Sequence, residues 1–228
     1  MNIKNLLEKT NLKYHHDFLS TELNIFSSFV KTQNDQLEDF IKNIKENIVE
    51  EEDCFGGNSY LKKHINVLDY DDYYDVEKIY KFELPMYQNQ SHLIAIWSIL
   101  EVELKKMYNY VSNEIGKCPD IPKKQKEISD FMHILKLFNL YGINFNENNQ
   151  FEKIVFFLDE EVRKLRNIWV HEGGEDKKNK LNINEIEDVD IYENKYNISK
   201  NYISKLIKKL FEFSRIVQQS IENFLYSK

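Results

Sequence analysis

Two arginines, an asparagine and a histidine lie close together in the second half of the chain, at Arg163, Arg166, Asn167 and His171. Only three of the 31 lysines and arginines are arginine, and two of these three stand within one predicted helical turn. A guanidinium makes bidentate hydrogen bonds to a phosphate or carboxylate, which an ammonium does not. Histidine accepts or donates a proton near neutral pH. The segment therefore carries groups that can bind an anion and perform acid–base chemistry.

The spacing of apolar residues predicts a helix from about residue 151 to the glycine pair at 173–174, which supplies a helix stop. Its apolar stripe consists of Phe151, Val155, Leu158, Val162, Leu165 and Trp169. This is the i, i+3/i+4 pattern of a helix face packed on a core. The polar groups are therefore expected on the outward face.

That outward face carries a polar row flanked by two apolar side chains. At about 100° per residue, Arg163, Asn167 and His171 fall in one line at i, i+4 and i+8. Phe156 and Val170 lie beside this line, and apolar groups on an outward face favour coverage by a partner. An alternative interpretation is that arginine and histidine near a helix C-terminus only stabilise the helix dipole.

The spacing of Arg166, Asn167 and His171 resembles the Arg-x4-His signature of the HEPN superfamily, in the common form where asparagine follows the arginine. The resemblance covers about residues 86–226, including the lengths and order of the predicted helices. It implies an all-α bundle that forms a homodimer in which two motifs face each other in one cleft. It also implies a metal-independent ribonuclease, of the kind common in toxin–antitoxin, abortive-infection and other antiviral systems.

The resemblance assigns each of these residues a role in cleaving RNA by attack of its own 2′-hydroxyl. His171 from two copies would serve as base and acid, Arg166 would stabilise charge on the phosphate, and Asn167 would orient His171 or the phosphate. Arg163 and Lys164 would hold flanking phosphates. The reaction requires no metal or other cofactor. The alternative function is a non-catalytic HEPN-like module that binds a protein or nucleotide partner.

Glu101 is predicted to support the site from a neighbouring helix. It borders the apolar stripe of a long predicted helix, and a half-buried carboxylate needs a cation. Arg163 or Arg166 is one candidate for that cation. The alternative is an ordinary i,i+4 surface pair with Lys105.

Residues 85–228 are expected to form the HEPN-like domain, and residues 1–84 an N-terminal helical extension packed on its bundle. The extension is predicted to hold helices interrupted near residues 32–34, the second ending at the acidic run 50–53. The domain's other predicted helices cover about residues 87–114, 122–141 and 199–226. The polar stretch 175–197 is expected to hold a short strand pair and is a candidate lid.

Composition limits the classes of partner and compartment. A net charge of -7 and a pI near 5.5 argue against a general nucleic-acid coat protein, although an acidic body can carry a small cationic cleft. Two distant cysteines fit a reducing cytoplasm better than a disulfide framework. No run approaches the ~18 apolar residues of a membrane span. We therefore expect a cytoplasmic protein whose partners are RNA, a second copy and an antitoxin or other regulatory protein.

Overall fold

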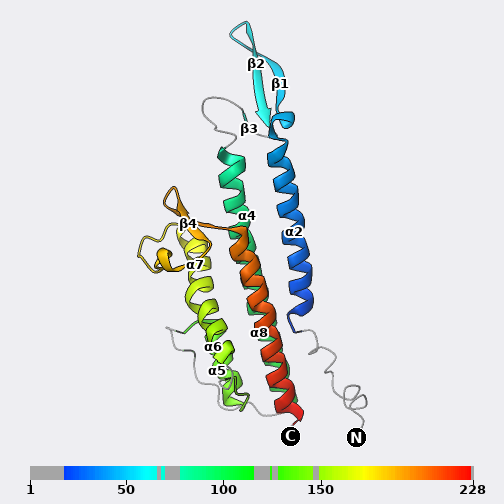
Figure 1. Ribbon diagram of the computed structural model, residues 1–228, viewed down its shortest axis with the longest axis vertical. Coiled ribbons are helices and arrows are strands. Elements are labelled where there is room, and N and C mark those ends of the chain that lie inside the picture. Colours follow the sequence, from blue (N-terminus) through cyan, green and yellow to red (C-terminus); the bar gives the residue numbers. More distant parts are fainter. Residues whose placement is uncertain are drawn as a thin grey trace.

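A computed structural model describes residues 18–65, 68–69, 78–115, 124, 128–145 and 149–226. The chain is mostly helical, and its long helices run side by side along the long axis of the molecule (Figure 1). The α-helices are α2 (Ser20–Lys42), α4 (Leu84–Ile115), α5 (Asp130–Leu140), α6 (Asn149–Phe156), α7 (Arg163–Glu172) and α8 (Lys200–Tyr226). The predicted all-α class is confirmed at this level, and the long helices expected near residues 87–114 and 199–226 are confirmed as α4 and α8.

The core lies between α4, α8 and the helices that flank them. The residues of α4 and α8 with less than 2% of their surface exposed include Leu93, Ile96, Trp97, Leu100, Leu104, Tyr202, Ile203, Leu206, Leu210, Phe213, Val217 and Ile221. Rings link three helices: Phe131 of α5 lies 5.6 Å from Trp97 of α4 and 5.7 Å from Phe213 of α8, measured between centroids. Burial of such apolar surface is the main force that holds the helices together.

The helix that carries the candidate residues is continuous from α6 through α7 but is widened in its middle. Residues Phe157–Val162 form a π-helical segment, η4, in which the N–H of Arg163 bonds to the carbonyl of Leu158, five residues earlier. Within this segment the adjacent side chains of Phe157 and Leu158 are both buried. The predicted apolar stripe is confirmed, since Val155 is half-buried and its other members are buried. The widened turn was not predicted.

α2 is one helix, so the predicted interruption near residues 32–34 is wrong. The hydroxyl of Thr32 forms a hydrogen bond within the helix, donating to the carbonyl of Ser28 at 2.9 Å. The next two residues contact α4: Gln33 Oε1 lies 2.8 Å from His92 Nε2, and Asn34 Oδ1 accepts from Gln88 at 2.7 Å. Polar residues that suggested a break therefore lie at a helix–helix contact.

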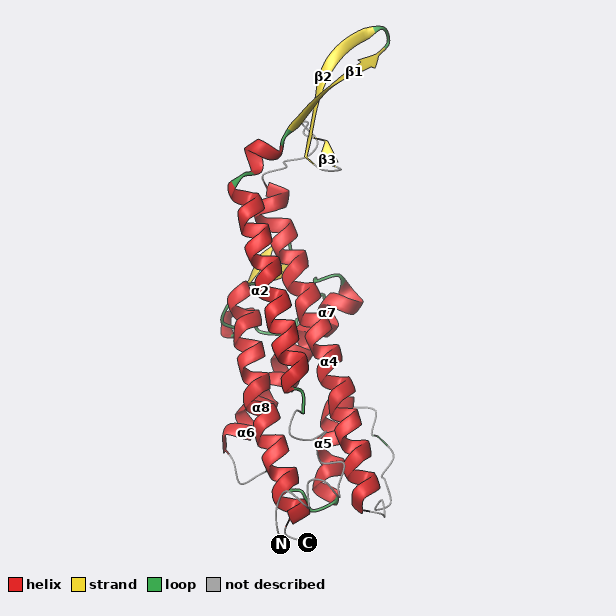
Figure 2. Cartoon of the chain, turned by 90° about the vertical axis from the view of Figure 1, so that its right-hand side faces the viewer, coloured by secondary structure: helices red, strands yellow, loops and turns green. Residues whose placement is uncertain are grey.

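The prediction that the acidic run 50–53 ends a helix is wrong, because this run lies in a strand. A short 3₁₀-helix, η2 (Ile44–Asn47), leads into the antiparallel strands β1 (Val49–Phe55) and β2 (Asn58–Ile65), and β3 (Leu68–Asp69) pairs with β2. Glutamates stand opposite lysines across the hairpin, in the pairs Glu50↔Lys63 and Glu51↔Lys62. The hairpin extends beyond one end of the helices (Figure 2). In the part of residues 1–84 that the structure describes, a helix leads into a projecting hairpin, so this part does not consist of helices alone.

α5 begins at Asp130 and not near residue 122 as predicted. Ser129 forms its N-cap, with Oγ accepting from Met132 N at 3.1 Å, and Ile128 precedes the helix. Of residues 122–127, all but Lys124 lie outside the described residues. Nothing helical in the described part of the chain has both the length and the apolar character of a membrane span.

The strand pair predicted after the glycine pair is confirmed. The short helix η5 (Ile183–Glu185) is followed by antiparallel strands β4 (Val189–Tyr192) and β5 (Lys195–Ile198). The ring of Tyr192 stacks on Phe82, with centroids 5.8 Å apart and planes within 6°. Phe82 lies in η3 (Ile79–Glu83), the π-helical segment that precedes α4. The strand pair is therefore held against the start of α4.

Candidate functional site

α7 packs on α4 and presents its predicted site residues on the side away from the core. Leu165, Ile168 and Trp169 are buried. The polar residues of the other face are half-buried or exposed, and these are Arg163, Lys164, Arg166, Asn167 and His171. The structure therefore brings these five predicted residues onto one broad helix face.

Arg163 is held by a carboxylate of its own helix. Its Nε donates to Asp159 Oδ1 at 2.6 Å, and the two side chains are only 26% and 16% exposed. The same carboxylate oxygen accepts from Ser129 Oγ at 2.8 Å, so the pair also ties α7 to the start of α5. Asp159 was not singled out from the sequence, although its i,i+4 spacing to Arg163 is a known signal for such a pair.

Lys164 is also paired within the helix. Its Nζ lies 2.5 Å from Glu160 Oε2, again one turn earlier, and both side chains are about one-third exposed or more. Exposed pairs of this kind contribute little to stability. Nevertheless, both residues predicted to hold flanking phosphates already have a carboxylate partner.

Arg166 differs from its neighbours because no carboxylate accompanies it within the described residues. One Nη1 hydrogen bond goes to the neutral Oδ1 of Asn167 at 3.0 Å. Its Nε is buried and has no hydrogen-bond partner. A buried donor left unpaired costs about 1–3 kcal/mol, and more when it is charged. Of the two arginines and the lysine on α7, this guanidinium is therefore the one without a carboxylate partner among the described residues.

His171 lies in the last turn of α7, and its side chain is exposed. Two exposed apolar residues border this face: Phe156 is 64% exposed and Val170 is 43% exposed. Together with the histidine they are among the exposed residues of this helix. The predicted outward position of both apolar residues is confirmed.

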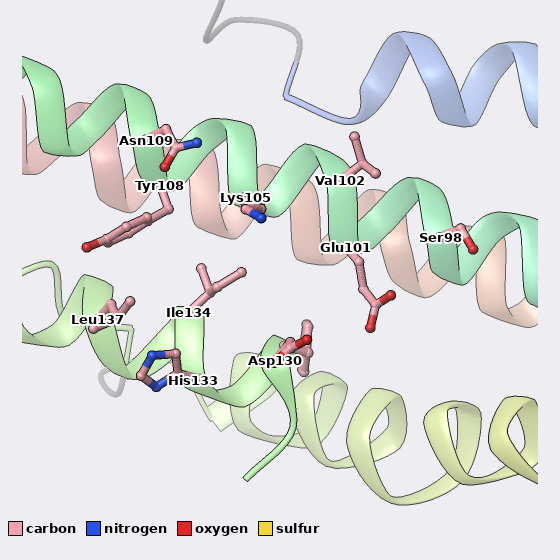
Figure 3. Close-up of a pocket in the computed structure, with 11 residues that line it drawn as sticks. Ser98, Glu101, Val102, Lys105, Tyr108, Asn109, Asp130, His133, Ile134 and Leu137 are labelled. Carbon is pink, nitrogen blue, oxygen red and sulfur yellow. The ribbon is translucent and has the colours of Figure 1, made fainter. Parts of the chain in front are cut away.

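Glu101 does not support the site as predicted. It makes no ion pair with Arg163, Arg166 or Lys105, all of which the structure describes. It lines a groove of about 510 Å³ between α4 and α5, and Figure 3 shows its carboxylate directed toward α5 near Asp130. Because Asp159 lies one turn from Arg163 on the same helix, it takes the contact that Glu101 was expected to make.

The chain after α7 is tied back to the helix by several hydrogen bonds. The N–H of Tyr196 donates to the carbonyl of Gly174 at 3.0 Å, and its hydroxyl donates to Asp176 Oδ2 at 3.0 Å. Burial and the hydrogen bond to Asp176 raise the pKa of Tyr196 to about 12. Glu172 pairs with Lys180, and this hydrogen bond lowers the pKa of Glu172. The segment considered as a lid is thus fastened beside the end of α7.

The described residues contain no group of three or more histidine, cysteine, aspartate or glutamate side chains positioned to hold a metal ion. No protein-family model, curated protein or solved structure matches the chain. The assignment of a function therefore depends on the geometry of α7 and on the resemblance of its motif.

Proposed function

We propose that the chain is a metal-independent endoribonuclease of HEPN type, which works as a homodimer in a toxin–antitoxin or antiviral defence system. The observation that carries this proposal is the state of Arg166. It is a half-buried guanidinium with an unpartnered Nε, five residues before an exposed histidine on the same helix. The Arg-x4-His resemblance supports the same reading.

In the proposed reaction, the 2′-hydroxyl oxygen attacks the adjacent phosphorus while the bond to the 5′-oxygen breaks. His171 of one copy removes the hydroxyl proton, and His171 of the other copy protonates the departing oxygen. Arg166 stabilises the charge that builds on the phosphate oxygens. The Oδ1 of Asn167 is engaged by Arg166, so its amide N–H groups remain for the phosphate or the imidazole.

The proposed cleft needs two copies because a single His171 cannot serve as base and acid in one step. The exposed Phe156 and Val170 are the apolar surface on which the two α7 helices would meet about a two-fold axis. Arg163 and Lys164 take a secondary role in this arrangement. Their carboxylate partners Asp159 and Glu160 must be exchanged for RNA phosphates before they hold the substrate.

The test is cleavage of fluorescently labelled RNA of varied sequence by the purified full chain, with EDTA present. Arg166→Ala and His171→Ala are expected to reduce cleavage by about 10²- to 10⁴-fold each. Arg215→Ala is the matched control, since Arg215 is the remaining arginine and is exposed on α8. A single 2′-deoxy substitution at the cleaved position should block the reaction. Uniform resistance of all RNAs to the wild-type protein contradicts the proposal.

A second candidate function, a non-catalytic HEPN-like binding module, is favoured by the intrahelical pairing of Arg163 and Lys164. That pairing leaves little free positive charge for an RNA backbone. In this case Arg166 donates hydrogen bonds to a carboxylate of a protein partner, such as an antitoxin or other regulator. Loss of partner binding in Arg166→Ala, with no cleavage by the wild type, selects this candidate.

A further inference from the structure

The groove between α4 and α5 is a second candidate site, separate from the motif face of α7 (Figure 3). Its volume of about 510 Å³ lies within the range of about 300–1,000 Å³ that is typical of small-molecule pockets. The groove is half-open, so an occupant keeps part of its surface in water. No residue of α7 lines it, so a ligand bound here is independent of the function proposed for the motif.

The floor of the groove is apolar and partly aromatic. Phe131 and Leu137 of α5 line it with only 1% and 6% of their surface exposed. Tyr108 and Ile134 are half-buried, and Val102 of α4 is 51% exposed. An apolar occupant would remove water from this surface, and a ring could pack on the aromatic side chains. The floor therefore suits one large apolar group.

Glu101 is the main reason to assign a ligand to the groove. Its carboxylate is directed across the groove toward α5 (Figure 3). The residue is half-buried, and its carboxylate has no partner among the described residues. Neither oxygen is closed off from solvent, so both remain accessible to an occupant. Because a half-buried carboxylate is stabilised by a cation, a cationic group of the occupant can complete this contact.

Lys105 adds an unpaired positive charge to the same wall of the groove. It lies one helical turn after Glu101, a spacing at which opposite charges often pair, and the two do not pair here. Figure 3 shows the side chain of Ile134 extending from α5 toward Lys105. The groove therefore presents an anion and a cation beside an apolar floor, on residues whose Cβ atoms are about 5–6 Å apart.

The other polar groups of the groove are engaged or uncharged, or can assist the same ligand. Ser98 Oγ donates to a carbonyl of its own helix at 2.9 Å. Asp130 pairs with Lys124, so its charge is offset. Asn109 is exposed and His133 is half-buried, and both can form hydrogen bonds with an occupant. An occupant that matches the groove therefore carries one positive group and one negative group.

We propose that this groove binds a free amino acid with a large apolar side chain. The ammonium group of the ligand donates to the Glu101 carboxylate, its carboxylate accepts from Lys105, and its side chain packs on the apolar floor. The two charged groups of an amino acid are bonded to one carbon, and the flexible Glu101 and Lys105 side chains can reach both. Because the groove is half-open, these ion pairs form without complete loss of hydration.

The test compares phenylalanine with three analogues, each of which lacks one recognised group. Phenethylamine lacks the carboxylate, 3-phenylpropionate lacks the amine, and alanine lacks the ring. Binding to the full chain is measured by calorimetric titration and by shifts of the Ile134 methyl signals in two-dimensional NMR. Phenylalanine is expected to bind in the millimolar range or tighter, and each analogue to bind about tenfold more weakly.

Two variants test the charged contacts separately. Glu101→Gln should bind phenylalanine as weakly as the wild type binds 3-phenylpropionate, and Lys105→Gln as weakly as the wild type binds phenethylamine. Both should fold, since neither side chain has a partner among the described residues. Glu114→Gln is the matched control and should leave binding unchanged, because Glu114 is exposed on the same helix and does not line the groove.

Val102→Trp is a further variant that fills the groove from α4 and keeps both charges. It should fold, as judged by circular dichroism, and should fail to bind phenylalanine. The proposal is overturned if the wild-type protein shows no response to millimolar phenylalanine, or if any of the three analogues binds as well. It is equally overturned if folded Glu101→Gln and Lys105→Gln bind phenylalanine normally.

Discussion

The indole of Trp169 covers Gly174 so closely that a Cβ on this glycine would lie 2.7 Å from two ring carbons. Gly174 has φ +93°, and its N–H bonds to the carbonyl of Ile168 at 3.3 Å. Its own carbonyl accepts from Tyr196 at 3.0 Å, so the backbone cannot easily move away from the ring. The end of α7 and the following strand pair are thus fixed by one close contact.

We expect Gly174→Ala to lower the free energy of unfolding by about 2–4 kcal/mol, because the strain of a positive φ adds to the clash with Trp169. Gly173→Ala is the matched control. Gly173 also has a positive φ, of 65°, but no atom lies within 4 Å of its added Cβ. It should lose only about 1 kcal/mol. Urea unfolding followed by circular dichroism measures both values, and equal losses would show that the Trp169 contact is unimportant.

The different surroundings of Arg163 and Arg166 predict opposite effects of the same substitution. Arg163→Gln breaks the partly buried pair with Asp159 and should cost about 1 kcal/mol of stability while changing RNA cleavage only a few-fold. Arg166→Gln should leave stability nearly unchanged, because it has no carboxylate partner within the described residues, and should abolish cleavage.

Asp159→Asn serves as the control for this separation. It removes the same pair from the other side, so its stability loss should match that of Arg163→Gln, and the double variant should lose no more than either. It also frees Arg163, so it should tighten RNA binding and steepen its dependence on salt. If Arg163→Gln proves as inactive as Arg166→Gln, Arg163 belongs to the catalytic machinery instead.

The helices could be predicted because each buries a regular apolar stripe. Leu100 and Leu104 of α4, and Leu206 and Leu210 of α8, repeat at the helical period and are all buried. The same period predicts that Phe156 and Val170 lie on the outward face of their helix, where both are exposed. Local spacing is sufficient to predict these helices and their buried faces, because the face with a regular apolar stripe packs on the core and the opposite face does not.

Features that depend on contacts between distant segments could not be predicted in this way. The segment at Glu51 is a strand because its backbone pairs with that of Lys62 across the hairpin, and Gln33 lies in an unbroken helix that contacts His92. From the sequence, Glu101 is expected to pair with Arg163 or Arg166, or alternatively with Lys105, because a half-buried carboxylate needs a cation. Arg163 instead pairs with Asp159, one turn away on the same helix. Tertiary pairing decided the first two cases, and local geometry decided the last.

Tyr196→Phe tests how firmly the chain after α7 is held. Near pH 8 it should cost about 1 kcal/mol, from the lost hydrogen bond to Asp176. Since the pKa of Tyr196 is raised to about 12 from 10.0, the hydroxyl stays protonated in the folded protein while the unfolded chain ionises. That contribution is complete below pH 10 and is lost as the pH rises toward 12. Urea unfolding at pH 8 and pH 11 should show a smaller difference between wild type and variant at the higher pH. A constant difference would contradict the assignment.

His92 predicts a second pH dependence, at the contact between α2 and α4. The ring is 2% exposed, lies edge-on to Phe26 and Phe29, and has an Nδ1 without a partner. Burial lowers its pKa below 6.5, so the folded protein holds it neutral with Nε2–H donating to Gln33. A proton added at Nδ1 would place a charge where no acceptor is available.

The unfolded chain therefore binds more protons than the folded chain once the pH falls below about 6.5. Stability should decline from that point and level off below the folded pKa of His92. In His92→Gln, which can still donate to Gln33, the decline should be absent, so the difference in unfolding free energy between wild type and variant should change in that window. Urea unfolding between pH 7.5 and 5.5, together with NMR titration of the His92 ring protons, measures both effects. Parallel curves for the two proteins would mean that His92 does not titrate as its burial requires.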